Sequence, residues 1–107
     1  MADKEHPIQD SWSELSSVDK IIHEPARLAV ITILDAVESA DFLYLQRAAG
    51  LTKGNLSVHL TKLEDAGLIE IQKTYQGKIP RTLCMLTMKG KEGFKVYKGQ
   101  MKGILGK

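Results

Sequence analysis

A run of small hydrogen-bonding side chains between residues 52 and 62 carries the most suggestive chemistry of the chain. Hydroxyl, amide and ammonium donors on short or flexible stems suit a helix that lies against base edges and phosphates. Asn55 and Ser57 are the best candidates for hydrogen bonds to bases, the lysines for phosphates, and Val58 for a thymine methyl group. For His59 we expect a phosphate contact, with partly buried packing as the alternative. The whole candidate set in this run is Thr52, Lys53, Asn55, Ser57, Val58, His59, Thr61 and Lys62.

The apolar residues of the same stretch predict the helix that would present this run. They recur at i, i+4 and i+7 and continue one turn further, so they fall on one stripe: Leu56, Leu60, Leu63 and Ala66. Thr52 is an acceptable N-cap, and Gly50 and Gly67 can end the preceding segment and this one. Taken alone, the pattern also fits any small helical domain with a polar outer face.

A β-hairpin is predicted directly after this helix. Residues 68–75 and 81–87 are rich in β-formers, and residues 76–80 contain Gly77 and Pro80 for a turn. Lys73, Lys78 and Arg81 make the hairpin end cationic. A cationic hairpin beside a polar helix is typical of a wing, which predicts a winged helix-turn-helix.

Several segments in this order resemble stand-alone winged-helix transcriptional regulators, similar to the MarR and ArsR groups and most like short MarR-related members. The resemblance covers about residues 18–98 and is carried by residues 23–29, 51–57, 63–69 and 80–90. It implies a recognition helix over residues 52–66 in the major groove and a wing over 75–81 on flanking backbone or the minor groove. It also implies a homodimer that regulates transcription on double-stranded DNA, with repression as the default.

The remaining helices are predicted from their apolar spacing, giving a mainly α fold with a small β-hairpin (α+β) in one domain over 1–107. This domain comprises an N-terminal arm or helix (1–17), a winged-helix core (18–88) and a C-terminal helix (89–107). Pro25 begins a scaffold helix, and residues 42–50 form the first helix of the helix-turn-helix, with a possible short strand at Phe42 and Leu43. The scaffold stripe is Leu28, Ile31, Leu34 and Val37.

The resemblance also implies that the two ends of the chain pair two subunits, and each end carries an apolar helical stripe that could serve this contact. For the C-terminal helix, folding back on its own domain is the alternative, and its glycines weaken it as an isolated helix. The expected dimer residues are Ile8, Trp12, Leu15, Phe94, Tyr97, Met101, Ile104 and Leu105.

Charge is divided unevenly along the chain. Residues 1–50 hold 4 basic and 9 acidic side chains, a net −5, whereas residues 51–107 hold 11 basic and 4 acidic, a net +7. This asymmetry places positive potential on the half with the predicted helix and wing, as expected for binding to nucleic acid. Scattered surface lysines are the alternative interpretation.

Other functional classes find little support in the sequence. His23-Glu24 begins like a zinc motif, but Arg27 occupies the second histidine position, so we expect no metal and no cofactor. No catalytic motif stands out, and we predict a non-enzyme. Without an expected membrane span or signal peptide, the protein is expected in the cytoplasm, associated with the nucleoid. Cys84 is expected to be buried rather than a thiol sensor.

Two further functions compete with binding to duplex DNA, and the sequence names no small-molecule effector. A winged helix can act as a protein–protein interaction module without specific DNA binding, with Tyr75 as a possible anchor. RNA binding would share the same electrostatics.

Overall fold

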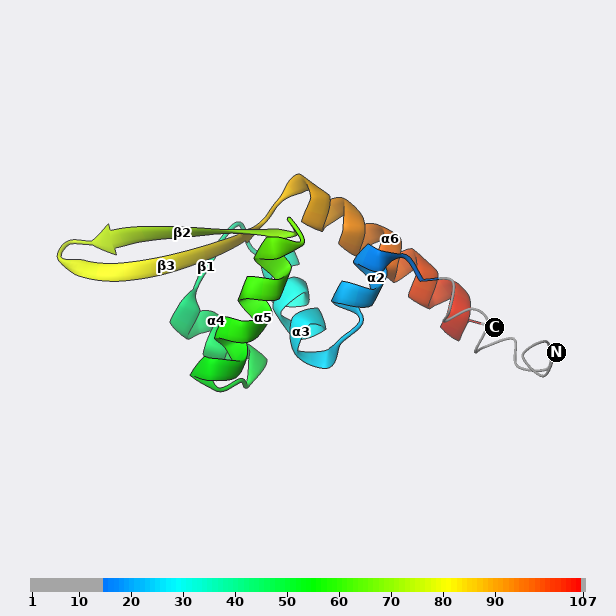
Figure 1. Cartoon of the computed structure of the whole chain (residues 1–107), viewed down its shortest axis with the longest axis horizontal. Helices are drawn as coiled ribbons and strands as arrows, with labels where there is room; N and C mark the ends of the chain where they lie inside the picture. Colours follow the sequence, from blue (N-terminus) through cyan, green and yellow to red (C-terminus); the bar gives the residue numbers. More distant parts are fainter. Residues whose placement is uncertain (1–14, 107) are drawn as a thin grey trace.

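The computed structural model describes residues 15–106, which form five helices and a small antiparallel sheet whose long hairpin projects away from the helices (Figure 1). The elements in chain order are α2 (Ser17–Ile22), α3 (Pro25–Asp35), β1 (Ala40–Asp41), α4 (Phe42–Ala49), α5 (Lys53–Asp65), β2 (Ile69–Gln76), β3 (Ile79–Leu86) and α6 (Met88–Leu105). This arrangement confirms the predicted winged helix-turn-helix, in which α4 and α5 form the helix-turn-helix and β2–β3 the wing.

The helix boundaries follow from side-chain caps at each start. Thr52 caps α5 as predicted, because its hydroxyl accepts a hydrogen bond from the Asn55 N–H. Pro25 occupies the first turn of α3, behind the Glu24 cap. Gly50 and Gly67 adopt left-handed conformations at the ends of α4 and α5, with φ of 66° and 77°.

The core confirms most of the predicted apolar stripes. Leu56, Leu60 and Leu63 are buried and fix α5 against the rest of the domain. In the scaffold helix the apolar stripe ends at Leu34, because α3 ends at Asp35. Val37 lies in the following loop and is 38% exposed. The inclusion of Val37 in the core was therefore wrong.

The short strand lies two residues earlier than predicted. It is formed by Ala40 and Asp41, whereas Phe42 already belongs to α4. The reason is the Asp41 carboxylate, which accepts a hydrogen bond from the Tyr44 N–H and so starts the helix at Phe42.

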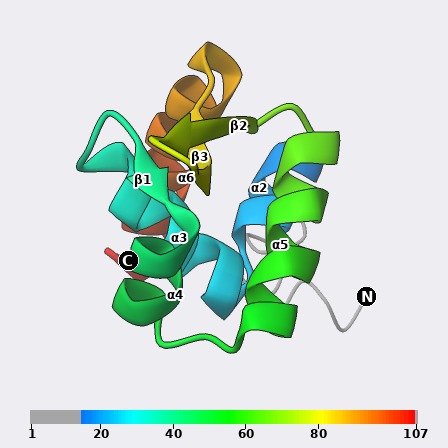
Figure 2. The same cartoon turned by 90° about the vertical axis from the view of Figure 1, so that its left-hand side faces the viewer.

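The sheet has the strand order β1-β3-β2, and all its pairs are antiparallel (Figure 2). The turn of the wing is tighter than predicted: Gly77 and Lys78 alone connect the strands, and Pro80 lies in β3 opposite Tyr75. A proline is tolerated there because β1 pairs only with Leu83 and Cys84, so the Pro80 position is at an edge of the sheet.

The C-terminal helix α6 packs against α2 and α3 of its own chain. Phe94 and Tyr97 belong to the hydrophobic core, and Ile104 is buried too. Their apolar stripe is thus covered by the same chain, which is the alternative that the periodicity left open. Leu105, by contrast, is 72% exposed.

At the other end, Leu15 is also buried, and Met101 is partly buried against the core. Ile8 and Trp12, the other residues assigned to subunit pairing, lie outside the described residues. No helix within residues 15–106 is long and apolar enough to cross a bilayer.

Candidate nucleic-acid interface

The outer face of α5 presents the polar run that the sequence singled out. Lys53, Asn55, Ser57, Thr61 and Lys62 are all exposed, while the leucines of the opposite face are buried. Val58 is exposed on the same helix, in agreement with an apolar contact to a ligand rather than to the core. The helix therefore offers donors of several lengths on one surface.

His59 departs from the rest of the run. Its side chain is only 18% exposed, and its Nδ1 lies 3.2 Å from Nη1 of Arg27 and 3.8 Å from Oε1 of Glu24. Because Arg27 can only donate, the short contact requires the unprotonated Nδ1 as acceptor. His59 thus joins α5 to the start of α3, which favours the packing alternative over the expected phosphate contact.

Glu24 is held in its charged form at this junction. Its carboxylate accepts a hydrogen bond from the Arg27 N–H at 2.9 Å, which is the main cause that lowers its pKa. Burial opposes this shift, and the positive charge of the nearby Arg27 guanidinium adds to it. The recognition helix is therefore supported by a small polar cluster that sequence spacing did not reveal.

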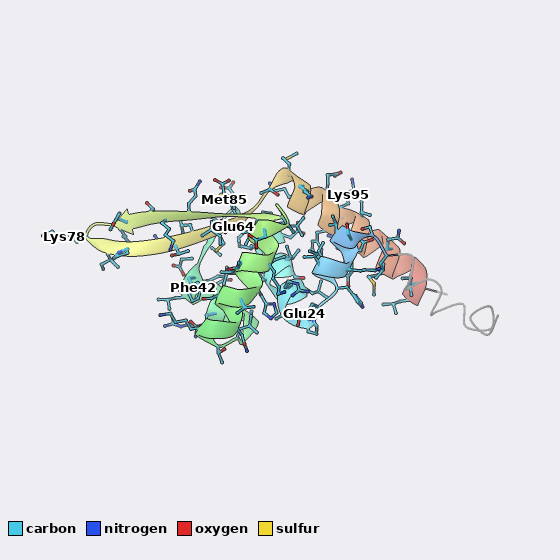
Figure 3. The ribbon with its side chains drawn as sticks, in the orientation of Figure 1. Glu24, Phe42, Glu64, Lys78, Met85 and Lys95 are labelled. Atoms are coloured by element: carbon cyan, nitrogen blue, oxygen red, sulfur yellow. The ribbon has the colours of Figure 1, made fainter. Side chains whose placement is uncertain are left out.

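Lys78 stands at the tip of the wing, far from the body of the domain (Figure 3). Its turn requires Gly77, whose φ is +64°. Tyr75 and Ile79 beside it are 71% and 67% exposed, so the tip combines one cation with two apolar side chains. The exposure of Ile79 was not anticipated from the sequence.

Arg81 is not a free cation at the hairpin end, because it forms an ion pair with Asp41. Its Nη2 lies 3.0 Å from Oδ2 of Asp41, and both side chains are about one-third exposed. The pKa of Asp41 is lowered, chiefly by the hydrogen bond from the Tyr44 N–H and also by Arg81. One carboxylate thus caps α4 and holds the base of the wing, and it offsets part of the Arg81 charge.

Two shallow grooves lie between the wing and the helix-turn-helix. The first, of about 410 Å³, is lined by Lys53 and Ser57 on one side and Arg81 on the other. The second, of about 340 Å³, is lined by Ser57, Thr61 and Lys73. The fold therefore brings Lys73 to the same groove as Ser57 and Thr61 of α5, whereas Lys62 and Lys78 lie outside both grooves.

The lysines of α5 and the wing are not neutralised by acidic neighbours among the described residues. Lys53, Lys62, Lys73 and Lys78 form no ion pair with any other residue in the range 15–106. A surface with four such lysines, short hydroxyl and amide groups and few large apolar anchors on α5 matches the needs of phosphate and base contacts.

The structure also bears on a thiol sensor and on a metal site. Burial raises the pKa of the Cys84 thiol to about 11, with smaller contributions from Glu64 and Asp41, so the thiolate that redox chemistry needs is disfavoured. Within the part of the chain that the structure describes, no group of three histidine, cysteine or acidic residues could hold a metal ion.

These features define a winged helix-turn-helix with an exposed recognition helix and a cationic wing. The winged helix DNA-binding domain family matches residues 26–105, and the chain belongs to this family. Among curated proteins, uncharacterized protein MJ0432 of Methanocaldococcus jannaschii is 37% identical over 79 residues, which is 73% of this chain and 85% of that protein.

Solved structures agree. The transcriptional regulator homologue protein from Pyrococcus horikoshii OT3 superposes with a TM-score of 0.76 at 31% identity, over 80% of this chain and 85% of its own. The transcriptional repressor CouR, bound to a 23-mer DNA duplex, superposes with a TM-score of 0.65 at 25% identity. The match covers 78% of this chain and 58% of the CouR chain. A MarR-family regulator from Silicibacter pomeroyi shares the fold, with a TM-score of 0.64 at 20% identity. The match covers 80% of this chain and 57% of that chain. The resemblance to MarR-like winged-helix regulators is thus confirmed.

Proposed function

We propose that the protein is a homodimeric transcriptional regulator, acting as a repressor, that binds specific sequences of double-stranded DNA. In this proposal α5 enters the major groove and the wing over residues 75–81 contacts the flanking backbone or minor groove. The observation that carries the proposal is the outer face of α5, where Asn55, Ser57 and Thr61 are exposed between Lys53 and Lys62.

Roles within this face follow from side-chain chemistry. Asn55 and Ser57 have the short hydrogen-bonding groups that read base edges, whereas Lys53 and Lys62 suit phosphates. Lys73 and Lys78 extend the cationic surface along the wing. Arg81 positions the wing through Asp41 and lines the groove beside Lys53, so we assign it a shared structural and phosphate-binding role.

Binding can be tested by fluorescence anisotropy on labelled duplexes that tile the region upstream of the coding sequence. Lys53→Ala/Lys78→Ala should weaken binding and flatten the slope of log K against log salt by about 0.9 for each phosphate that is no longer neutralised. Lys20→Ala removes an exposed lysine from α2, which packs against α3 and α6, and serves as the control. Equal salt slopes for the wild type and the double variant would contradict the assigned surface.

Dimerisation is proposed through the two ends of the chain, because a single module makes few contacts for an operator of two half-sites. Four of the expected interface residues are buried within their own chain, which removes them from the proposed interface: Leu15, Phe94, Tyr97 and Ile104. The remaining candidates on α6 are Leu105 and the partly buried Met101, with Ile8 and Trp12 from the N-terminal arm. Sedimentation equilibrium should show a dimer for the wild type and weaker association for Leu105→Glu. Leu43→Glu, the same change at an exposed position on α4, serves as the control and should leave the dimer intact. A wild-type monomer at micromolar concentration would refute the proposed dimer.

The protein–protein interaction module remains the second candidate because of exposed apolar side chains on the wing and on α4. Tyr75, Ile79 and Leu43 are all well exposed. If they anchor a protein partner, Tyr75→Ala/Ile79→Ala should leave DNA affinity unchanged. A loss of DNA affinity in that variant assigns them to contacts with the DNA backbone instead.

A further inference from the structure

Helix α6 carries a row of lysines along one side. Lys91, Lys95, Lys98 and Lys102 are spaced by four, three and four residues, so they fall within one narrow arc of the helix. All four are exposed, and they extend over about 16 Å of helix axis at 1.5 Å per residue. We call these four residues the α6 lysine row.

The row is only partly neutralised. Nζ of Lys98 lies 3.6 Å from Oδ2 of Asp35 and 4.6 Å from the centre of the Phe94 ring, which places it at the border of the core. Lys91, Lys95 and Lys102 form no ion pair with another residue between 15 and 106. Three regularly spaced cations are therefore available to an external anion.

The row does not belong to the α5 and wing surface. Helix α3 packs against both α5 and α6, and Figures 1 and 2 show α6 leading away from the wing. In Figure 3, Lys95 points away from the side on which α5 lies. A straight duplex seated on α5 and the wing would thus leave the α6 lysine row unoccupied.

We propose that the α6 lysine row binds the phosphate backbone of a second nucleic-acid duplex, so that the protein bridges two duplexes. This inference rests on the proposed function of the α5 surface and adds a second, sequence-independent contact to it. A row of about 16 Å spans the phosphates of roughly half a helical turn of one strand. Insertion into a membrane is disfavoured, because the apolar face of α6 is already buried by Phe94 and Tyr97.

The test uses two charge-matched triple variants of the full chain. Lys91→Gln/Lys95→Gln/Lys102→Gln removes the row, and Lys53→Gln/Lys62→Gln/Lys78→Gln removes cations from the α5 and wing surface. Energy transfer between two 30-base-pair duplexes, one carrying a donor dye and the other an acceptor, reports bridging. Anisotropy of one labelled duplex reports single-duplex binding, and thermal unfolding checks that both variants fold.

The wild type should give energy transfer that the α6 variant reduces at least tenfold while its single-duplex affinity stays within twofold. With three phosphates neutralised, the bridging contact should weaken about 40-fold between 50 and 200 mM salt. Energy transfer that persists in the α6 variant, or its absence in a wild type that binds one duplex, would overturn the proposal. Unchanged single-duplex affinity in the α5 and wing variant would instead refute the proposed function.

Discussion

Gly90 offers a sharp test of how α6 joins the domain. It is buried in the first turn of α6, and a Cβ built on it would overlap the carbonyl oxygen of Leu68 and lie 3.3 Å from Cδ2 of Leu86. The carbonyl cannot turn aside without cost, because it accepts a hydrogen bond from the Thr87 N–H at 3.1 Å. Gly90→Ala must therefore separate the start of α6 from Leu68, directly before β2.

The expected cost is at the upper end of overpacking effects, about 3 kcal/mol, since backbone rather than a flexible side chain must move. For a domain of this size that loss lowers Tm by roughly 15 °C. Gly99 supplies the matched control in the same helix, because a Cβ there meets nothing within 4 Å. Gly99→Ala should raise the free energy of unfolding by about 0.5–1 kcal/mol.

Thermal and urea unfolding followed by circular dichroism would measure both variants. The opposite signs matter more than the magnitudes, because both variants replace a glycine of the same helix with alanine, a better helix former. If Gly90→Ala were as stable as Gly99→Ala, the close contact between α6 and Leu68 would be wrong, and with it the folding of α6 onto its own chain.

Four further predictions concern the site and its supports. Thr52→Ala should lower the free energy of unfolding by about 1 kcal/mol, because α5 loses its cap, and Thr52→Ser should lower it much less. Urea denaturation would measure both variants. The pKa of Asp41 lies below its usual 3.8, so the stability that this carboxylate contributes is present above about pH 4 and lost as the pH falls. Asp41→Asn should therefore flatten the dependence of the unfolding free energy on pH in acid. Parallel pH dependences for the wild type and the variant would contradict this. In a double-mutant cycle Asp41→Asn and Arg81→Gln should couple by about 0.5 kcal/mol, since both groups are partly exposed. With its pKa near 11, Cys84 should react with a thiol reagent at pH 8 only on unfolding; rapid reaction of the native protein would be inconsistent with its burial.

Local pattern was sufficient for the elements of the site. The spacing of Leu56, Leu60 and Leu63 places α5, and Thr52 and Gly67 mark its ends, because periodicity and capping depend on neighbours within a few residues. The hairpin was predicted in the same way, although the edge position that tolerates Pro80 in β3 depends on where β1 pairs.

Contacts between distant segments could not be predicted from such patterns. Arg81 meets Asp41 across 40 residues, and His59 meets Arg27 across 32. Neither partner could be identified from the sequence, where Arg81 was expected to bind DNA and His59 to contact phosphate or pack partly buried. An apolar stripe on α6 shows that Phe94 and Tyr97 are covered, but not whether the cover is the same chain or a second copy. Tertiary packing decides that question, and here the same chain covers them.

The central claim is that the outer face of α5 and the wing bind duplex DNA. Anisotropy titrations of the wild type, Asn55→Ala, Lys53→Ala/Lys78→Ala and Lys20→Ala on the upstream tiles, at several salt concentrations and with excess non-specific duplex, test it most directly. We expect competitor-resistant binding to one tile, a loss of preference for that tile in Asn55→Ala, and weaker binding with a flatter salt slope in the lysine pair alone. Absence of wild-type binding at low salt, or equal effects of Lys20→Ala and the lysine pair, would contradict the claim.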